Sequence, residues 1–114
     1  MDKSGRAGDE AANPRGKLGI MLIKLDVLEA IKRGEVTLQF RRWTRPSVKA
    51  GGTLKTKVGL LRIGRIDEMN PADVTLADAR KAGFRDIADF QRWLGTMKQG
   101  PLFHRIEVSY IGEP

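Results

Sequence analysis

The chain has 114 residues, of which 40% are hydrophobic and 31% are charged, and its formal net charge is +7. A chain of this length forms one domain with one modest core, and its apolar runs are too short to cross a bilayer, so we expect no membrane partner. Because it contains no cysteine, disulfides, thiolate metal sites and cysteine nucleophiles are excluded, and we expect a cytoplasmic protein.

The positive charge is concentrated in one part of the chain. From Val36 to Ile66 there is no aspartate or glutamate, whereas eight residues of this stretch are lysine or arginine. The stretch therefore carries more positive charge than the whole chain. A neutral solvated surface normally mixes both signs, so this concentration predicts binding to a polyanion.

The first sixteen residues show no periodicity and few large apolar side chains. We interpret residues 1–16 as a disordered leader and residues 17–114 as the folded domain. The compact apolar run from Lys17 to Lys24 is typical of a buried strand.

A short helix follows this run. Asp26 and Glu29 have the spacing of a capping box at its start, and Gly34 supplies a left-handed residue at its end. The segment from Thr75 to Gly83 repeats the pattern, with Asp78 three residues after Thr75. It predicts a second short helix.

Asp86 and Asp89 mark the start of a third helix. Apolar residues recur after them at helical spacing, and Gly95 is a candidate end of the helix. The apolar positions are Ile87, Phe90, Leu94 and Met97. Trp93 and Phe84 are expected to pack in the core.

The remaining segments alternate like strands. Val36, Leu38 and Phe40 are expected to point to one side, and Thr37, Gln39 and Arg41 to the other. Thr53–Lys57 and Val58–Ile66 are predicted to pair, with a bulge where Leu60 and Leu61 interrupt the alternation. The last strand places alternate residues from Leu102 to Tyr110 on one face.

Five short strands and three short helices that do not separate every strand predict an α+β protein, built as a small, mostly antiparallel β-barrel. Several of these segments also resemble one known family, the ASCH domain of the PUA-like superfamily. The similar segments are Ile31–Trp43, Gly52–Leu54, Val58–Ile66, Asp78–Phe84 and Leu102–Tyr110. The resemblance implies a PUA-like barrel with a cleft between barrel and helices, and a role in RNA binding or RNA-related chemistry.

The chain departs from the family at two positions. The family pattern is roughly Gly-x-Lys-x-x-Glu-x-Arg; Gly34 and Arg41 fit it, whereas Val36 and Gln39 replace the lysine and the glutamate. Family members that act as amidohydrolases on modified cytidine use a lysine and a threonine in this strand. Thr37 is not at the position of that threonine, which aligns with Gln39. The resemblance therefore favours holding RNA over this chemistry, and no catalytic residue is assigned.

The candidate RNA-binding residues lie in or next to the basic stretch. Lysine and arginine would bind phosphate, a tryptophan between arginines could stack on an unpaired base, and a glutamine could bond a base edge. The candidates are Thr37, Gln39, Arg41, Arg42, Trp43, Arg45, Lys49, Lys55 and Lys57. The alternative is an ordinary solvated face, with Trp43 closing the edge of the core.

Other functions have weaker support. A ribonuclease, or a hydrolase of a modified nucleoside, could use Thr37, Lys55 and Lys57 in a cleft, and the basic face could instead bind an acidic protein. His104, the only histidine, is expected at the edge of the core rather than as a base. Three acidic residues follow the basic stretch without the spacing of a metal loop, so we predict no metal and no cofactor. They are Asp67, Glu68 and Asp73.

Overall fold

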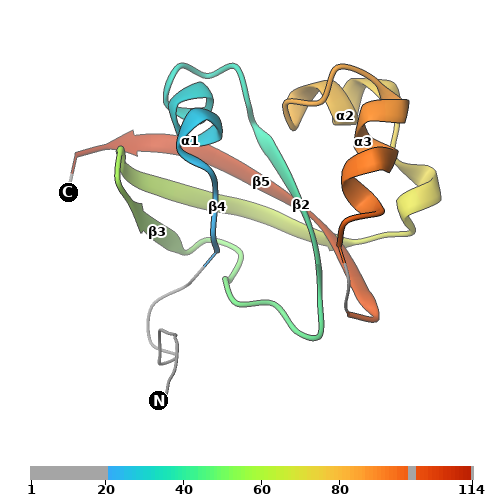
Figure 1. Cartoon of the computed structure of the whole chain (residues 1–114). Helices are drawn as coiled ribbons and strands as arrows, with labels where there is room; N and C mark the ends of the chain where they lie inside the picture. Colours follow the sequence, from blue (N-terminus) through green and yellow to red (C-terminus); the bar gives the residue numbers. More distant parts are fainter. Residues whose placement is uncertain (1–20, 98–99, 114) are drawn as a thin grey trace, which may run out of the picture.

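The computed structural model describes residues 21–97 and 100–113. These residues form three α-helices, a single 3-10 turn and four strands, which curl into a half-barrel (Figure 1). In chain order the elements are α1 (Leu25–Lys32), β2 (Leu38–Trp43), β3 (Thr53–Thr56), β4 (Gly59–Glu68), η1 (Pro71–Asp73), α2 (Leu76–Lys81), α3 (Ile87–Leu94) and β5 (Leu102–Gly112).

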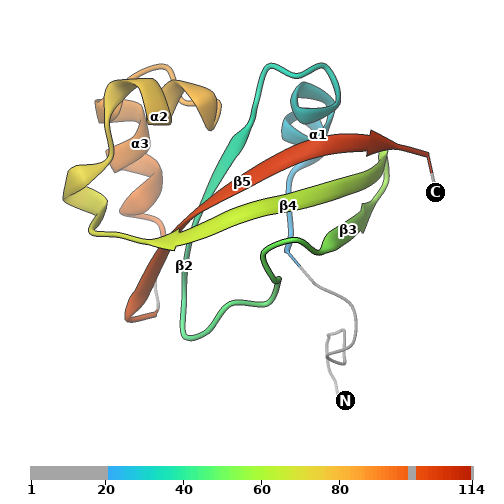
Figure 2. The ribbon, with the colours of Figure 1, turned by 180° about the vertical axis from the view of Figure 1, so that it is seen from behind.

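The four strands make one antiparallel sheet in the order β2-β5-β4-β3. The predicted α+β class and antiparallel sheet are therefore confirmed. The long strands β4 and β5 form the middle of the sheet, and Figure 2 shows them with α2 and α3 at one end and β3 toward the other.

The predicted strand over 17–24 is wrong for the four residues of it that the structure describes. Residues 21–24 lie in no strand, and Leu22 is 87% exposed. An apolar run becomes a strand only where a neighbouring strand can bond its backbone. Here the Leu22 carbonyl accepts a hydrogen bond from the Arg41 side chain instead, at 2.8 Å. The predicted leader and residues 17–20 lie outside the described residues.

The start of α1 differs from the prediction, whereas its end agrees. The helix begins at Leu25 after Lys24, which forms no side-chain cap, and the Asp26 carboxylate accepts from the Val27 N–H inside the first turn. Asp26 as the cap is therefore wrong, because the Leu28 N–H already bonds the Lys24 carbonyl at 2.9 Å and closes the first turn before Asp26 could cap it. Gly34 follows the helix with φ +81°, the left-handed conformation expected there.

The other two helices begin where their caps predict. The Thr75 hydroxyl accepts from the Asp78 N–H at 3.1 Å, and the Asp86 carboxylate accepts from the Asp89 N–H at 2.8 Å. Asp89 in turn accepts from the Arg85 N–H at 2.9 Å, so two backbone donors at this helix start are satisfied. α3 ends before Gly95, as expected.

The sheet has two apolar faces. Its inner face packs on α1, and its outer face packs on α2 and α3. The inner cluster includes Leu28, Ile31, Leu54, Leu61, Ile63, Ile106 and Val108. The outer cluster includes Leu38, Phe40, Ala79, Phe90 and Phe103. Phe40 stacks on Phe103 with the ring centroids 5.5 Å apart, and Trp93 and Phe84 pack against this cluster as predicted.

The register departs from regular pairing at two places between β4 and β5. One lies between Leu60 and Leu61, where the adjacent leucines predicted a bulge, and the other lies between Ile63 and Ile66. The second irregularity contains Gly64 and Arg65 and lies beside the middle of β5. No helix in the described part of the chain has the length and apolar character needed to span a membrane.

Candidate nucleic-acid interface

The predicted RNA-binding residues of β2 are divided between the two faces of the sheet. Residues paired directly across antiparallel strands share a face. Gln39 pairs with Ile106 and Arg41 with His104, on the inner face, whereas Arg42 pairs with Phe103, on the outer face. The predicted alternation is therefore observed from Leu38 to Trp43, and it separates Arg41 from Arg42. It is wrong for the two residues before the strand, because β2 begins only at Leu38: Val36 packs in the inner cluster and Thr37 lines a cavity of the outer face.

Gln39 is buried and Arg41 is half-buried, both on the inner face of the sheet. The Gln39 amide is buried and donates to the Leu38 carbonyl at 2.8 Å. The Arg41 guanidinium donates to the Phe40 and Leu22 carbonyls at 2.7 and 2.8 Å. Burial, which disfavours the charged form, lowers the pKa of Arg41 to about 10. Both side chains thus donate hydrogen bonds to backbone carbonyls of the chain itself.

Trp43 and His104 form a bonded pair at the inner edge of the sheet. The Trp43 Nε1–H donates to His104 Nδ1 at 2.6 Å, and the ring centroids lie 5.8 Å apart. His104 is buried at 7% exposure, as the core-edge interpretation predicted. The sequence alone offered no partner for this histidine, because the two residues are 61 positions apart.

Arg42 lies on the outer face and is half-buried. Its Nε is shielded from solvent and has no hydrogen-bond partner among the described residues. An unsatisfied buried donor of this kind is costly.

The exposed cations of the basic stretch occupy the β2–β3 loop, β3 and β4. Arg45 and Lys49 lie in the loop, Lys55 lies on β3, and Lys57 lies in the turn before β4. The loop ends against β4, where the Gly51 N–H donates to the Ile63 carbonyl at 2.8 Å.

Arg62 is a further exposed cation on this surface, and it is not among the RNA-binding residues predicted from the sequence. Arg62 is exposed on β4 and pairs with Thr53 on one side and with Ser109 on the other. Thr53, Arg62 and Ser109 therefore form a row across the outer face, and Lys55 lies on the same face two residues after Thr53. The signal was present in the sequence, because Arg62 lies between the buried residues Leu61 and Ile63.

These cations lack acidic neighbours. Among the described residues, no carboxylate lies within the 4.0 Å ion-pair limit of the seven basic side chains from Arg41 to Arg62. Elsewhere in the described chain the arginines are ion-paired except Arg80, which donates to the Arg85 carbonyl. Arg33 bonds Glu35 at 2.9 Å, and Arg85 and Arg92 both contact Asp89. The absence of acids in the sequence is thus not compensated by acids brought near in space from the described residues.

Two cavities lie beside these residues. A cavity of about 460 Å³ is lined by Leu22, Leu25, Lys55 and Lys57, among others. A second cavity of about 330 Å³ is lined by Thr37, Gly64, Lys81, Arg105, Glu107 and Ser109 together with Leu38 and Val108. The structure therefore places Thr37 in a different cavity from Lys55 and Lys57, and it does not assemble these three candidates into one reaction site.

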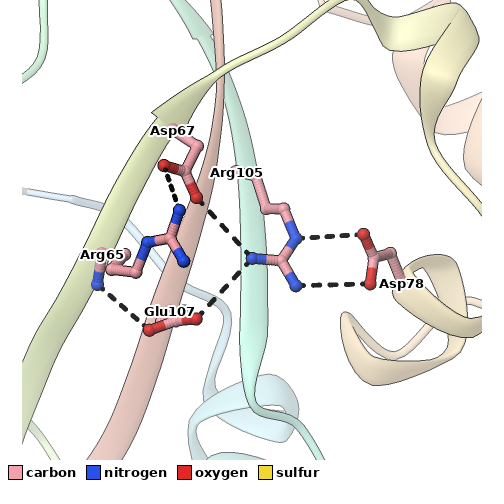
Figure 3. A network of polar contacts seen from close by, with 5 residues as sticks. All are labelled: Arg65, Asp67, Asp78, Arg105 and Glu107. Atoms are coloured by element: carbon pink, nitrogen blue, oxygen red, sulfur yellow. Dashed lines mark hydrogen bonds and ion pairs between the residues drawn. The ribbon is translucent and has the colours of Figure 1, made fainter.

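The second cavity adjoins a network of charged side chains (Figure 3). Arg105 of β5 donates to both carboxylate oxygens of Asp78 on α2, at 3.0 and 3.4 Å. The hydrogen bond to Asp78 raises the pKa of Arg105 above its ordinary value. Asp67 and Glu107 contact Arg105 at 3.9 and 3.7 Å. Asp67, one of the three acids considered for a metal, is thus engaged with arginines.

Comparison of the chain with family models, with curated proteins and with solved structures finds no match. The class of molecule that the geometry defines is a small α+β protein with an antiparallel half-barrel sheet, and the exposed cations along one side of it have no ion pair with a described carboxylate.

Proposed function

We propose that this chain is an RNA-binding module, with a PUA-like half-barrel that holds the RNA backbone on the outer face of β3 and β4 and on the adjoining β2–β3 loop. The observation that supports this proposal is the set of exposed cations without described acidic partners. They are Arg45, Lys49, Lys55, Lys57 and Arg62.

Such a surface suits a nucleic-acid backbone. Exposed cations neutralise phosphates and release condensed counterions, which makes the affinity fall as salt rises. The row formed by Thr53, Arg62 and Ser109 adds two hydroxyl groups beside a guanidinium, and hydroxyls can bond phosphate or ribose oxygens. The resemblance of the chain to the ASCH domain favours RNA over DNA.

The same proposal assigns to this chain the binding of RNA and not its cleavage. At the two positions where the ASCH pattern has lysine and glutamate, this chain has Val36 and Gln39, and both of these side chains are buried. Thr37 and Lys55 line separate cavities. General acid–base chemistry needs its groups within hydrogen-bond reach of one reacting centre.

The test is a comparison of two triple variants that lower the net charge equally. The first changes Lys49, Lys55 and Arg62 to glutamine. We expect its affinity for single-stranded RNA to fall about tenfold or more, and its plot of log affinity against log salt to flatten by about 0.7 for each phosphate that the variant no longer neutralises. Fluorescence anisotropy over a salt series measures both, and recovery of intact RNA distinguishes holding from cleavage.

The matched control changes three exposed arginines that are ion-paired, namely Arg33, Arg85 and Arg92, to glutamine. We expect this variant to keep most of its affinity and salt dependence. Equal losses in the two variants would show a response to net charge alone and would contradict the proposed surface. A wild-type chain that does not bind RNA at low salt would overturn the proposal itself.

A further inference from the structure

The cavity of about 330 Å³ lies on the outer face, between the end of α2 and the middle of β5. Its size is at the lower end of cavities that hold small organic groups. The Thr37 N–H donates to the Lys81 carbonyl at 2.9 Å, and the Thr37 carbonyl accepts from the Val108 N–H at 3.0 Å. These two bonds join α2, the segment before β2 and β5 into a fixed wall.

The charged network beside the cavity has one carboxylate more than it has guanidinium groups. Asp78 takes two hydrogen bonds from Arg105, and Asp67 takes one from Arg65 at 3.2 Å. Glu107 has no such bond from a guanidinium of the described residues. One of its oxygens accepts from the Arg65 backbone N–H at 3.2 Å, and the other lies 3.7 Å from Arg105 (Figure 3).

Glu107 is therefore an acceptor with spare capacity in the cavity. Its side chain is 42% exposed, so an incoming group can reach it. The other polar groups of the cavity are the hydroxyls of Thr37 and Ser109 and the exposed Lys81. A carboxylate and a lysine that line one cavity match a ligand edge that presents N–H donors beside a carbonyl oxygen.

Among the bases of RNA, guanine alone has two adjacent N–H donors on such an edge, since its N1–H and N2–H lie side by side and its O6 lies next to N1–H. Uracil has the single N3–H between two carbonyl oxygens, so it can give the carboxylate only one hydrogen bond. Adenine and cytosine each present one amino group beside a ring-nitrogen acceptor, which a carboxylate repels. We propose that this cavity is a subsite for one unpaired guanine, with Glu107 accepting from N1–H and N2–H and Lys81 donating to O6. The inference rests on the proposed RNA-binding function and adds base selectivity to it.

The cavity is continuous with the basic surface. Ser109 lines the cavity and pairs directly with Arg62 on the neighbouring strand. Adjacent strands lie about 4.8 Å apart. A nucleotide whose base enters the cavity thus has its backbone next to the row of exposed cations.

The lack of a side chain at Gly64 leaves the space that the Glu107 side chain occupies. A Cβ added at this position would lie 2.9 Å from Glu107 Oε1 and 3.0 Å from Glu107 Cβ. Gly64→Ala therefore has to move the Glu107 side chain, although it changes no charge and removes no polar group. It offers a second way to disturb the same acceptor.

The experiment uses a short single-stranded oligouridine with one central guanine, adenine or cytosine, and measures affinity at constant salt by anisotropy. We expect wild-type protein to bind the guanine oligonucleotide about tenfold or more tightly than the others, as a good bidentate contact to a base allows. Glu107→Gln and Gly64→Ala are expected to remove this preference while binding of the adenine oligonucleotide stays within about twofold.

The control is Glu68→Gln, which removes an exposed carboxylate from β4 that has no ion pair with a described residue. It should keep the guanine preference. Equal wild-type affinity for the three oligonucleotides would overturn the guanine subsite and leave the basic surface standing. A uniform loss for all three in Glu107→Gln would also overturn it. Absence of RNA binding in the wild type would instead refute the proposed function, and the subsite with it.

Discussion

Burial determines which hydrogen-bond partners several polar side chains of β2 have. Arg41 is in the basic stretch, but its guanidinium is turned inward and bonds the Phe40 and Leu22 carbonyls. Trp43 contributes its N–H to His104 rather than leaving it to a ligand. A buried polar group has to find its partner inside the fold, because water does not reach it.

Trp43→Phe is predicted to lower the free energy of unfolding by about 1–3 kcal/mol, because it leaves the buried His104 Nδ1 without its donor. Urea denaturation of the purified chain measures the change. Trp93→Phe is the matched control, since Trp93 is also half-buried and packs among aromatic rings. A loss at position 43 no larger than that at position 93 would show that packing alone explains it.

At the level of elements, short helices depend on their ends. α2 has six residues and α3 has eight, which is too short for stability in isolation. Their first turns are closed by Thr75 and Asp86, and their apolar sides pack on the outer face of the sheet. Capping fixes where each helix begins, and packing supplies most of its stability.

The start of α3 is predicted to weaken in acid. The Arg85 N–H bonded to the Asp89 carboxylate, helped by the charges of Arg85 and Arg92, holds the pKa of Asp89 below its ordinary 3.8. A carboxyl whose pKa is lower in the folded state contributes stability that is complete above the unfolded pKa and is lost as pH falls through the folded pKa. The stability contributed by Asp89 should therefore be present above pH 3.8 and disappear below it.

Asp89→Asn lacks this titration. The difference in unfolding free energy between wild type and Asp89→Asn, measured by urea denaturation over a pH series, should favour the wild type near neutrality and shrink in acid below the ordinary pKa of 3.8. A difference that stays constant across this range would show that the carboxylate charge does not stabilise α3.

Across the domain as a whole, a polar link joins the helices to the sheet. Arg105 belongs to β5 and Asp78 to α2, and their side chains are only 22% and 19% exposed. The link lies beside the outer cluster formed by Phe40, Phe90 and Phe103, whose packing provides the main attraction. The directional bonds of Arg105 set how α2 sits on the sheet, and so shape the cavity next to it.

A double-mutant cycle on Arg105→Met and Asp78→Asn should give a coupling free energy of about 1–3 kcal/mol, since the pair shares two charge-assisted hydrogen bonds away from bulk water. The more exposed pair of Arg65 and Asp67 is the comparison and should give less than about 1 kcal/mol. Equal coupling in the two cycles would argue against a special role for the Arg105 link.

Much of the local structure follows from residues close together in the chain. Thr75 and Asp86 mark helix starts, Gly34 marks a helix end, and the adjacent Leu60 and Leu61 mark an irregularity in β4. Each of these signals acts through backbone groups within a few positions, so the sequence contains the whole cause. The exception is Asp26, which lies inside the first turn of α1 instead of capping it.

The basic character of the stretch from Val36 to Ile66 and its three strands can be predicted from the sequence alone, because charge and alternation are properties of consecutive residues. The folded arrangement was needed to place Arg41 on the inner face and Arg62 on the outer face of the sheet, and to bring Glu107 and Lys81 to one cavity. Those placements depend on the pairing register and on which helix covers which part of the sheet. Both arise from contacts between residues far apart in the chain, which no local pattern encodes.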